Sequence, residues 1–322
     1  MTRGTAIAAL AVVGLVAGGT YLAVHTGLGP LPGSEGCTAT VAGYTVAMST
    51  EQAENASLIA AIAERRGLPA RALSIAIATA YQESKLQNLD GGDRDSLGLF
   101  QQRPSQGWGT PTQIQDPYYA ANAFYDALVQ VDGYRDMPIT QAAQAVQRSA
   151  FPDAYADHEL DGRTIASALS GYSRAAFSCV VSRDDVSSQE PAASGLTSRA
   201  NAVRADLAKS FGELSLGGFA RGGVTSGHMA GSSHYDGRAL DVFFRPISAD
   251  NRRRGWVVAH YLVANAHRLS LAHVIFDGQI WTAGTPSEEG WRPFEPSGLT
   301  GNESPETLAI LEHRDHVHVD VA

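Results

Sequence analysis

The chain contains few cysteines and few charged residues, and both facts limit the class of protein to which it can belong. Only 2 of its 322 residues are cysteine and 18% are charged, whereas 44% are hydrophobic. This composition is typical of a globular protein and argues against a disordered one. Lysine and arginine number 24 against 33 acidic residues, so the formal net charge is −9. Because nucleic-acid binding requires a basic surface, we expect no nucleic-acid partner.

The sequence also has no internal repeat of about 20 to 50 residues and no long low-complexity tract. Its length leaves room for two domains of ordinary size. Residues 181–197 are mostly polar and small, a composition typical of a linker. We therefore predict a first domain over residues 37–180, a linker over 181–197 and a second domain over 198–322.

One long apolar run is present. Residues 5–24 are apolar apart from Gly, Thr and one Tyr, and Arg3 precedes them. About 20 such residues just span a bilayer, and a positive charge on the short side fits the positive-inside tendency. We expect residues 1–25 to be a membrane anchor or a signal segment. The rest of the chain would then lie outside the cell membrane on a single-pass anchor, or would be secreted if the segment is cleaved.

The two cysteines, Cys37 and Cys179, stand at the ends of the first predicted domain. An exported chain with an even, sparse cysteine count is typical of a protein with one disulfide. We expect this pair to be bonded and to join the two ends of the domain. Two free buried thiols are the alternative.

Histidines are concentrated near the C-terminus, where 8 of the 10 lie at or after His228. His234 and Asp241 lie among small residues that allow close approach of the backbone. His316 and His318 are two residues apart, so on a strand both imidazoles leave from one face. Zinc takes about four ligands, usually imidazole or carboxylate, and a catalytic zinc keeps one position open for water. We predict a zinc site that uses His234, Asp241 and one histidine of the pair, with the other histidine moving a proton.

These residues fall on a known pattern, Ser-x-His-x-x-Gly-x-Ala-x-Asp over 232–241 and His-x-x-His-x-His over 313–318. The pattern resembles the zinc peptidases that cut the peptide stems of bacterial peptidoglycan, which include D-Ala-D-Ala carboxypeptidases and murein endopeptidases. The resemblance implies three zinc ligands, His234, Asp241 and His318. It also implies His316 as general base or transition-state stabiliser and Arg221 as a substrate-orienting residue. The order of helical and strand patterns favours an α+β fold for this domain.

A buried helix in the first domain ends close to a glutamate. Residues 72–81 are apolar on every side, so this helix should be buried, and Glu83 follows at its end. Desolvation disfavours a charged carboxylate and raises its pKa, as a general acid working near neutral pH requires. An ordinary solvent-exposed glutamate is the alternative. Helical patterns elsewhere in residues 37–180 predict that this domain is all-α.

The pair Glu83-Ser84, followed after a polar loop by Gly98-Leu99-Phe100-Gln101, resembles the lytic transglycosylases. These enzymes have a lysozyme-like fold and cut the glycan strands of peptidoglycan. The resemblance implies Glu83 as the catalytic acid, with Ser84 and Gln101 as substrate-binding residues. It also implies attack by the sugar's own hydroxyl, which gives an anhydro product.

Hydrolysis of the glycan remains an alternative, because glycoside hydrolases generally use a second carboxylate and Asp93 and Asp95 lie in the polar loop. Together the resemblances predict a two-domain cell-wall protein of the actinobacterial type. We expect an all-α lysozyme-like domain and an α+β zinc-peptidase-like domain after an N-terminal membrane segment. Peptidoglycan would be cut in its glycan strands and in its stem or cross-bridge peptides. A non-catalytic wall-binding or assembly protein that retains both folds is the alternative.

Overall fold

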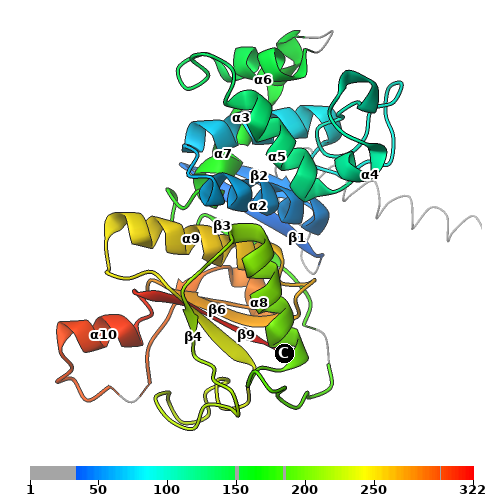
Figure 1. The fold of residues 1–322 in the computed structure, drawn as a ribbon. Helices are drawn as coiled ribbons and strands as arrows, with labels where there is room; N and C mark the ends of the chain where they lie inside the picture. The colour runs from blue at the N-terminus through cyan, green and yellow to red at the C-terminus, as the bar shows by residue number, and fades with distance from the viewer. Residues whose placement is uncertain (1–33, 149–151, 184–185, 298) are drawn as a thin grey trace, which may run out of the picture.

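The computed structural model describes residues 34–148, 152–183, 186–297 and 299–322 (Figure 1). The predicted membrane segment at residues 1–25 lies outside these residues. Within the described part of the chain, no helix combines the length and the hydrophobicity that crossing a bilayer requires.

Residues 34–180 form helices packed against a small antiparallel sheet. The strands follow the spatial order β2-β1-β3 and are β1 (Gly36–Val41), β2 (Tyr44–Met48) and β3 (Phe177–Val180). The helices are α2 (Thr50–Arg65), α3 (Ala70–Ser84), α4 (Pro111–Ile114), α5 (Pro117–Leu128), α6 (Ile139–Gln147) and α7 (Glu159–Leu169). Two short 3-10 helices complete the part, η1 (Pro104–Gln106) and η2 (Pro152–His158).

This sheet overturns the predicted fold class, because the part is not all-α: the protein combines helices with antiparallel sheets in both of its parts. The hairpin has a local physical cause. Ala42 and Gly43 both have positive φ, at 51° and 81°, and they join Val41 directly to Tyr44 across the strands. A two-residue turn of this kind matches the twist of two antiparallel strands.

The disulfide prediction is confirmed. Cys37 and Cys179 are bonded and are directly opposed across β1 and β3. Both are buried, at 1% exposure. The bond therefore joins the first strand of the part to its last, across 142 residues of sequence.

Replacing Cys37 and Cys179 together with serine should lower the free energy of unfolding by about 2–5 kcal/mol, because the long loop closed by the bond gains freedom in the unfolded chain. Urea unfolding of the oxidised protein and the double variant measures this difference. The reduced wild-type protein serves as control and should unfold at the same urea concentration as the variant. An unchanged midpoint in both samples would contradict a stabilising role for the bond.

Residues 196–322 are built on a six-stranded antiparallel sheet with the order β4-β5-β9-β6-β7-β8. The strands are β4 (Leu216–Gly217), β5 (Ala239–Phe243), β6 (Leu271–Phe276), β7 (Gln279–Thr282), β8 (Arg292–Pro293) and β9 (His316–Val321). The helices are α8 (Ser198–Phe211), α9 (Ala249–Ala264) and α10 (Pro305–Leu311), with the 3-10 helix η3 (Thr285–Glu289). The last strand of the chain, β9, therefore lies inside the sheet between β5 and β6.

The two parts share one hydrophobic core. Figure 1 shows α9 between α2 and the larger sheet, and α9 contacts both α2 and β6. The indole N–H of Trp281 donates to the carbonyl of Cys179 at 3.0 Å, and that of Trp291 donates to the carbonyl of Phe177 at 2.8 Å. The strand β3 is thus paired with β1 on one side and hydrogen-bonded to the second part through two tryptophans.

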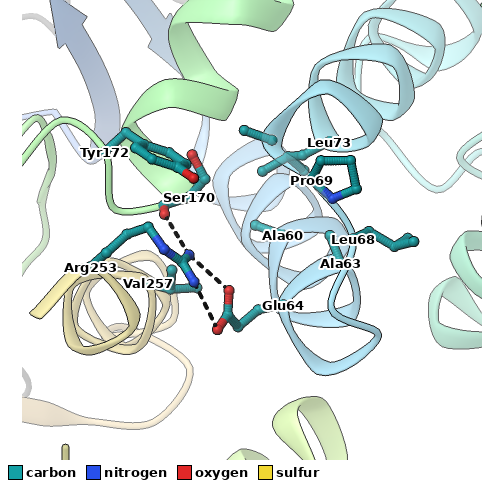
Figure 2. Close-up of a pocket in the computed structure, with 11 residues that line it drawn as sticks. Ala60, Ala63, Glu64, Leu68, Pro69, Leu73, Ser170, Tyr172, Arg253 and Val257 are labelled. Carbon is teal, nitrogen blue, oxygen red and sulfur yellow. Dashed lines mark hydrogen bonds and ion pairs between the residues drawn. The ribbon is translucent and has the colours of Figure 1, made fainter. Parts of the chain in front are cut away.

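An ion-pair cluster marks the same boundary. Figure 2 shows Arg253 of α9 directed at Glu64 of α2, beside a cavity of about 70 Å³. Arg253 Nη1 lies 2.9 Å from Glu64 Oε2 and donates to the carbonyl of Ser170 at 3.1 Å. Arg254 Nε lies 3.1 Å from the other oxygen of Glu64. One carboxylate of the first part therefore holds two guanidinium groups of the second.

Candidate functional site

The strands β5 and β9 bring three of the predicted metal ligands together. Asp241 on β5 and His318 on β9 are direct cross-strand partners, and His234 approaches from the turn that precedes β5. All three side chains are buried. His234 Nε2 lies 3.0 Å from His318 Nδ1 and 3.3 Å from Asp241 Oδ1, and the last two atoms are 3.2 Å apart. We refer to this candidate site, formed by these three residues, as the metal centre.

The size of this triangle fits a tetrahedral zinc ion. Ligand atoms at about 2.0–2.2 Å from a tetrahedral zinc are about 3.3–3.6 Å from one another. The three separations of 3.0–3.3 Å come close to that spacing. Two imidazole nitrogens and one carboxylate oxygen are also a usual donor set for zinc. His234, Asp241 and His318 would therefore hold the ion, with a fourth position left for water or substrate.

Local backbone geometry directs His234 to the centre. Its Nδ1 lies 2.7 Å from the carbonyl of Gly218, which can only accept a hydrogen, so Nδ1 carries the proton and Nε2 is available to a metal. Gly218 has a φ of +76°, and a Cβ there would lie 2.3 Å from the His234 ring and 2.8 Å from Asp241. Only glycine allows this close approach of the backbone.

The electrostatics of the metal centre favour a positive charge. Burial by itself would lower the pKa of His318, but its contacts with the carboxylates of Asp241 and Asp320 outweigh burial and raise the pKa to about 9. Burial also disfavours ionised Asp241, yet hydrogen bonds from His234 and His318 hold its pKa well below the ordinary range. The carboxylate therefore stays ionised and a cation, whether a proton or a metal, is stabilised beside it.

His316 lies at the edge of the metal centre. Its Nε2 is 3.8 Å from Asp241 Oδ1, and its Nδ1 is 2.7 Å from Asp315 Oδ1. Asp315 in turn accepts a hydrogen bond from Arg245 Nε at 2.6 Å. Burial opposes the ionisation of Asp315, but His316 and Arg245 lower its pKa. An ionised Asp315 fixes the proton of His316 on Nδ1 and leaves Nε2 facing the centre as a base.

Two further histidines line the site. The ring of His313 lies 4.6 Å from that of His316, and burial lowers its pKa to about 3, so it is neutral. His228 stacks on His234 with ring centroids 3.8 Å apart, and a ligand atom of His228 lies within 4.8 Å of those of His234 and Asp241. The sequence pattern of the predicted zinc site does not include His228. With His318 all three separations are 3.0–3.3 Å, so we take His318 as the candidate third ligand.

Arg221 lies three residues beyond Gly218 and is exposed. It lines an open hollow together with Arg204 and Phe219, and the guanidinium of Arg204 lies 5.7 Å from the ring of Phe219. Among the contacts of the described residues, none joins Arg221 to the metal centre. Arg221 therefore lies on an exposed surface, and its role in orienting substrate stays a prediction.

Glu83 is the second-last residue of α3 and forms a separate candidate site, the acid site. Its Oε1 accepts a hydrogen bond of 2.6 Å from the hydroxyl of Tyr155 in η2. Burial raises the pKa of Glu83, and hydrogen bonds with Tyr155 and Gln147 lower it in part. A carboxyl group with a raised pKa keeps its proton at higher pH, which suits a general acid.

The two residues predicted to bind substrate beside Glu83 have different surroundings. Ser84 is buried, and its hydroxyl donates to the carbonyl of Leu99 at 2.7 Å, which ties the segment containing Gln101 to the end of α3. Gln147 donates to the neighbouring carbonyl of Phe100 at 2.7 Å. Gln101 is half-buried and has a φ of 45°. The hydrogen bonds of Ser84 and Gln147 therefore hold the loop of residues 98–101 beside Glu83. Of the two predicted substrate-binding residues, Gln101 is the one that is partly open to solvent.

Asp93 and Asp95, two aspartates of the polar loop, have other partners than Glu83. Asp95 accepts hydrogen bonds from the backbone of Ser105 at 2.8 Å and from Arg103 Nε at 2.6 Å, and these contacts lower its pKa. Asp93 is exposed, 3.8 Å from Arg94. In the described part of the chain no contact joins either aspartate to Glu83. Asp95 is therefore engaged by Arg103 and Ser105, and Asp93 lies in solvent beside Arg94.

Comparison with known proteins adds one finding. Residues 192–303 match the family model of the VldE C-terminal domain. The VldE match contains His234 and Asp241 and ends before His316 and His318. No curated protein matches the chain. The first part and the last strand of the sheet lie outside the VldE match.

Replacing Tyr155 with phenylalanine should raise the pKa of Glu83, and should move the alkaline limb of any reaction that uses Glu83 as an acid to higher pH by about one unit. The hydroxyl stabilises ionised Glu83, so its loss raises the pKa further, and a general acid is active while it is protonated. The rate of product release against pH measures the shift. Tyr44→Phe is the matched control, because its hydroxyl donates to Asp161 instead. If the alkaline limb of Tyr155→Phe stays at the wild-type pH or moves to lower pH, the hydrogen bond from Tyr155 to Glu83 is refuted.

Proposed function

We propose that this protein is an extracytoplasmic peptidoglycan-remodelling enzyme that cuts stem or cross-bridge peptides with a zinc ion held by His234, Asp241 and His318. The convergence of three ligand atoms within 3.3 Å of one another carries the proposal. The pattern over residues 232–241 and 313–318, which resembles that of zinc peptidases acting on peptidoglycan, supports the substrate class.

The chain's own residues supply the proton transfers. A bound zinc would provide Lewis acidity, which activates water and polarises a peptide carbonyl at neutral pH. His316 Nε2 takes a proton from the attacking water and returns it to the leaving amine. Asp315, bonded to Nδ1 of His316, holds the ring in the required tautomer and stabilises it while it is charged.

We also propose that the acid site cuts glycan strands. The half-buried Glu83, with its raised pKa and its hydrogen bond from Tyr155, favours this second activity. Glu83 donates its proton to the glycosidic oxygen and, once ionised, accepts a proton from the sugar hydroxyl that attacks the same ring. Asp95 is held by Arg103 and Ser105, which supports this intramolecular route to an anhydro product over attack by water.

Digestion of purified peptidoglycan, followed by mass spectrometry of the products, tests both activities. We expect new peptide termini that disappear when a zinc chelator is added. Anhydro-sugar ends should form with or without the chelator, because no cluster of metal-ligating side chains lies at the acid site among the residues that the structure describes. Intact polymer after incubation with folded, zinc-loaded protein would instead support the non-catalytic wall-binding or assembly protein.

A further inference from the structure

A second aspartate lies behind the metal centre, on the far side of the His318 ring. Asp320 follows His318 by two residues on β9, so both side chains leave the strand on the same face. Its carboxyl group is buried, at 5% exposure. Asp320 Oδ2 lies 3.7 Å from His318 Nε2, an ion-pair distance, while His318 Nδ1 faces Asp241 and His234.

Two residues from other elements hold this carboxylate in place. Ser233 donates its hydroxyl hydrogen to Asp320 Oδ2 at 2.8 Å, and His273 Nδ1 lies 2.9 Å from Asp320 Oδ1. Ser233 directly precedes the ligand His234, and His273 lies on the neighbouring strand β6. Both oxygens of Asp320 are therefore fixed, and one of them remains directed at the ring of His318.

The chemistry of a metal-binding imidazole requires such a partner. One ring nitrogen binds the metal through its lone pair, and the other must then carry the hydrogen. Because Nδ1 of His318 faces the metal centre, Nε2 carries the hydrogen and Asp320 is the carboxylate beside it. We propose that Asp320 is a positioning residue that sets the tautomer and orientation of His318 for zinc. This inference rests on the proposed metal centre.

The chain provides a matched control for this role. Asp315 also lies beside an imidazole and is also buried, but its partner is His316, which we do not assign as a ligand. Asp320→Asn and Asp315→Asn each remove one negative charge with little change of shape. Only the first should act on the metal.

Competition with a chromophoric chelator measures the zinc affinity of the purified protein. Asp320→Asn should weaken it about 10- to 100-fold, while Asp315→Asn should change it by less than about threefold. The visible absorption of the cobalt-substituted protein gives a second readout, and its bands should shift in Asp320→Asn alone. Thermal unfolding of the metal-free variants shows whether each is folded.

The outcomes separate this inference from the proposed function. A wild-type protein without zinc affinity would overturn the metal centre and the role of Asp320 together. A wild-type protein that binds zinc, with unchanged affinity in folded Asp320→Asn, would overturn the role of Asp320 alone. If Asp320→Asn does not fold, Ser233→Ala releases the same carboxylate from a half-buried position and should still weaken zinc binding about three- to tenfold. Unchanged affinity in that variant would likewise overturn the role.

Discussion

Replacing His234 with alanine should abolish the release of new peptide termini from peptidoglycan, with a loss of about a thousandfold or more. The variant removes one of three candidate ligand atoms that lie within 3.3 Å of one another, and the two that remain would hold a metal only weakly. Zinc content of the purified variant and mass spectrometry of the digest measure the two effects. Anhydro-sugar ends should still form, because the acid site is separate.

His228→Ala is the control for this experiment. His228 stacks on His234 and is close enough to offer a ligand atom, yet the proposed centre uses His318 instead. We expect this variant to retain zinc and most of its peptide cleavage. Loss of zinc in His228→Ala with retention in His318→Ala would show that the other set of donors holds the metal. Peptide cleavage that persists in His234→Ala would refute the metal centre altogether.

Replacing Glu83 with glutamine should abolish anhydro-sugar products, with a loss of about a hundred- to ten-thousandfold. Glutamine keeps the shape of the side chain and can still accept the hydrogen bond from Tyr155, but it has no proton to donate to a glycosidic oxygen. The yield of anhydro ends per unit of protein measures the loss. Peptide termini should form at the rate of the wild-type protein.

Asp95→Asn shows whether water or a sugar hydroxyl attacks. Asp95 is engaged by Arg103 and Ser105, so the variant should release the same products at nearly the same rate. A large loss of glycan cleavage, or reducing ends without an anhydro group, would instead favour hydrolysis with a second carboxylate. Anhydro products that persist in Glu83→Gln would rule out Glu83 as the acid.

The sequence anticipated features that depend on residue type and short spacing. The alternation of His316 and His318 on a strand places both rings on one face, and a sparse, even number of cysteines points to the observed disulfide. The sheet of the first part was missed for two reasons. First, the turn of its hairpin is Ala42-Gly43, which is not the strong Asn-Gly or Asp-Gly signal for such a turn. Second, its third strand, β3, pairs with β1 although the two strands lie at opposite ends of this part of the sequence.

Contacts between distant residues explain what was missed at the site. Asp320 contacts His273 because β9 pairs with β6. This pairing cannot be predicted from the sequence of either strand alone. His228 reaches His234 through a loop rich in glycines with positive φ, which has no periodic pattern to follow. A sequence motif thus identifies ligands more readily than the residues that hold them.

The tryptophan contacts at β3 have a consequence for how such a protein changes during evolution. Trp281 and Trp291 find their acceptors on a strand of the first part, and α2 and α9 enclose a common core. An exchange of either half by recombination would leave both indole groups without acceptors and would open apolar surface to water. The two halves are therefore expected to be inherited as one unit, and not shuffled separately among unrelated genes.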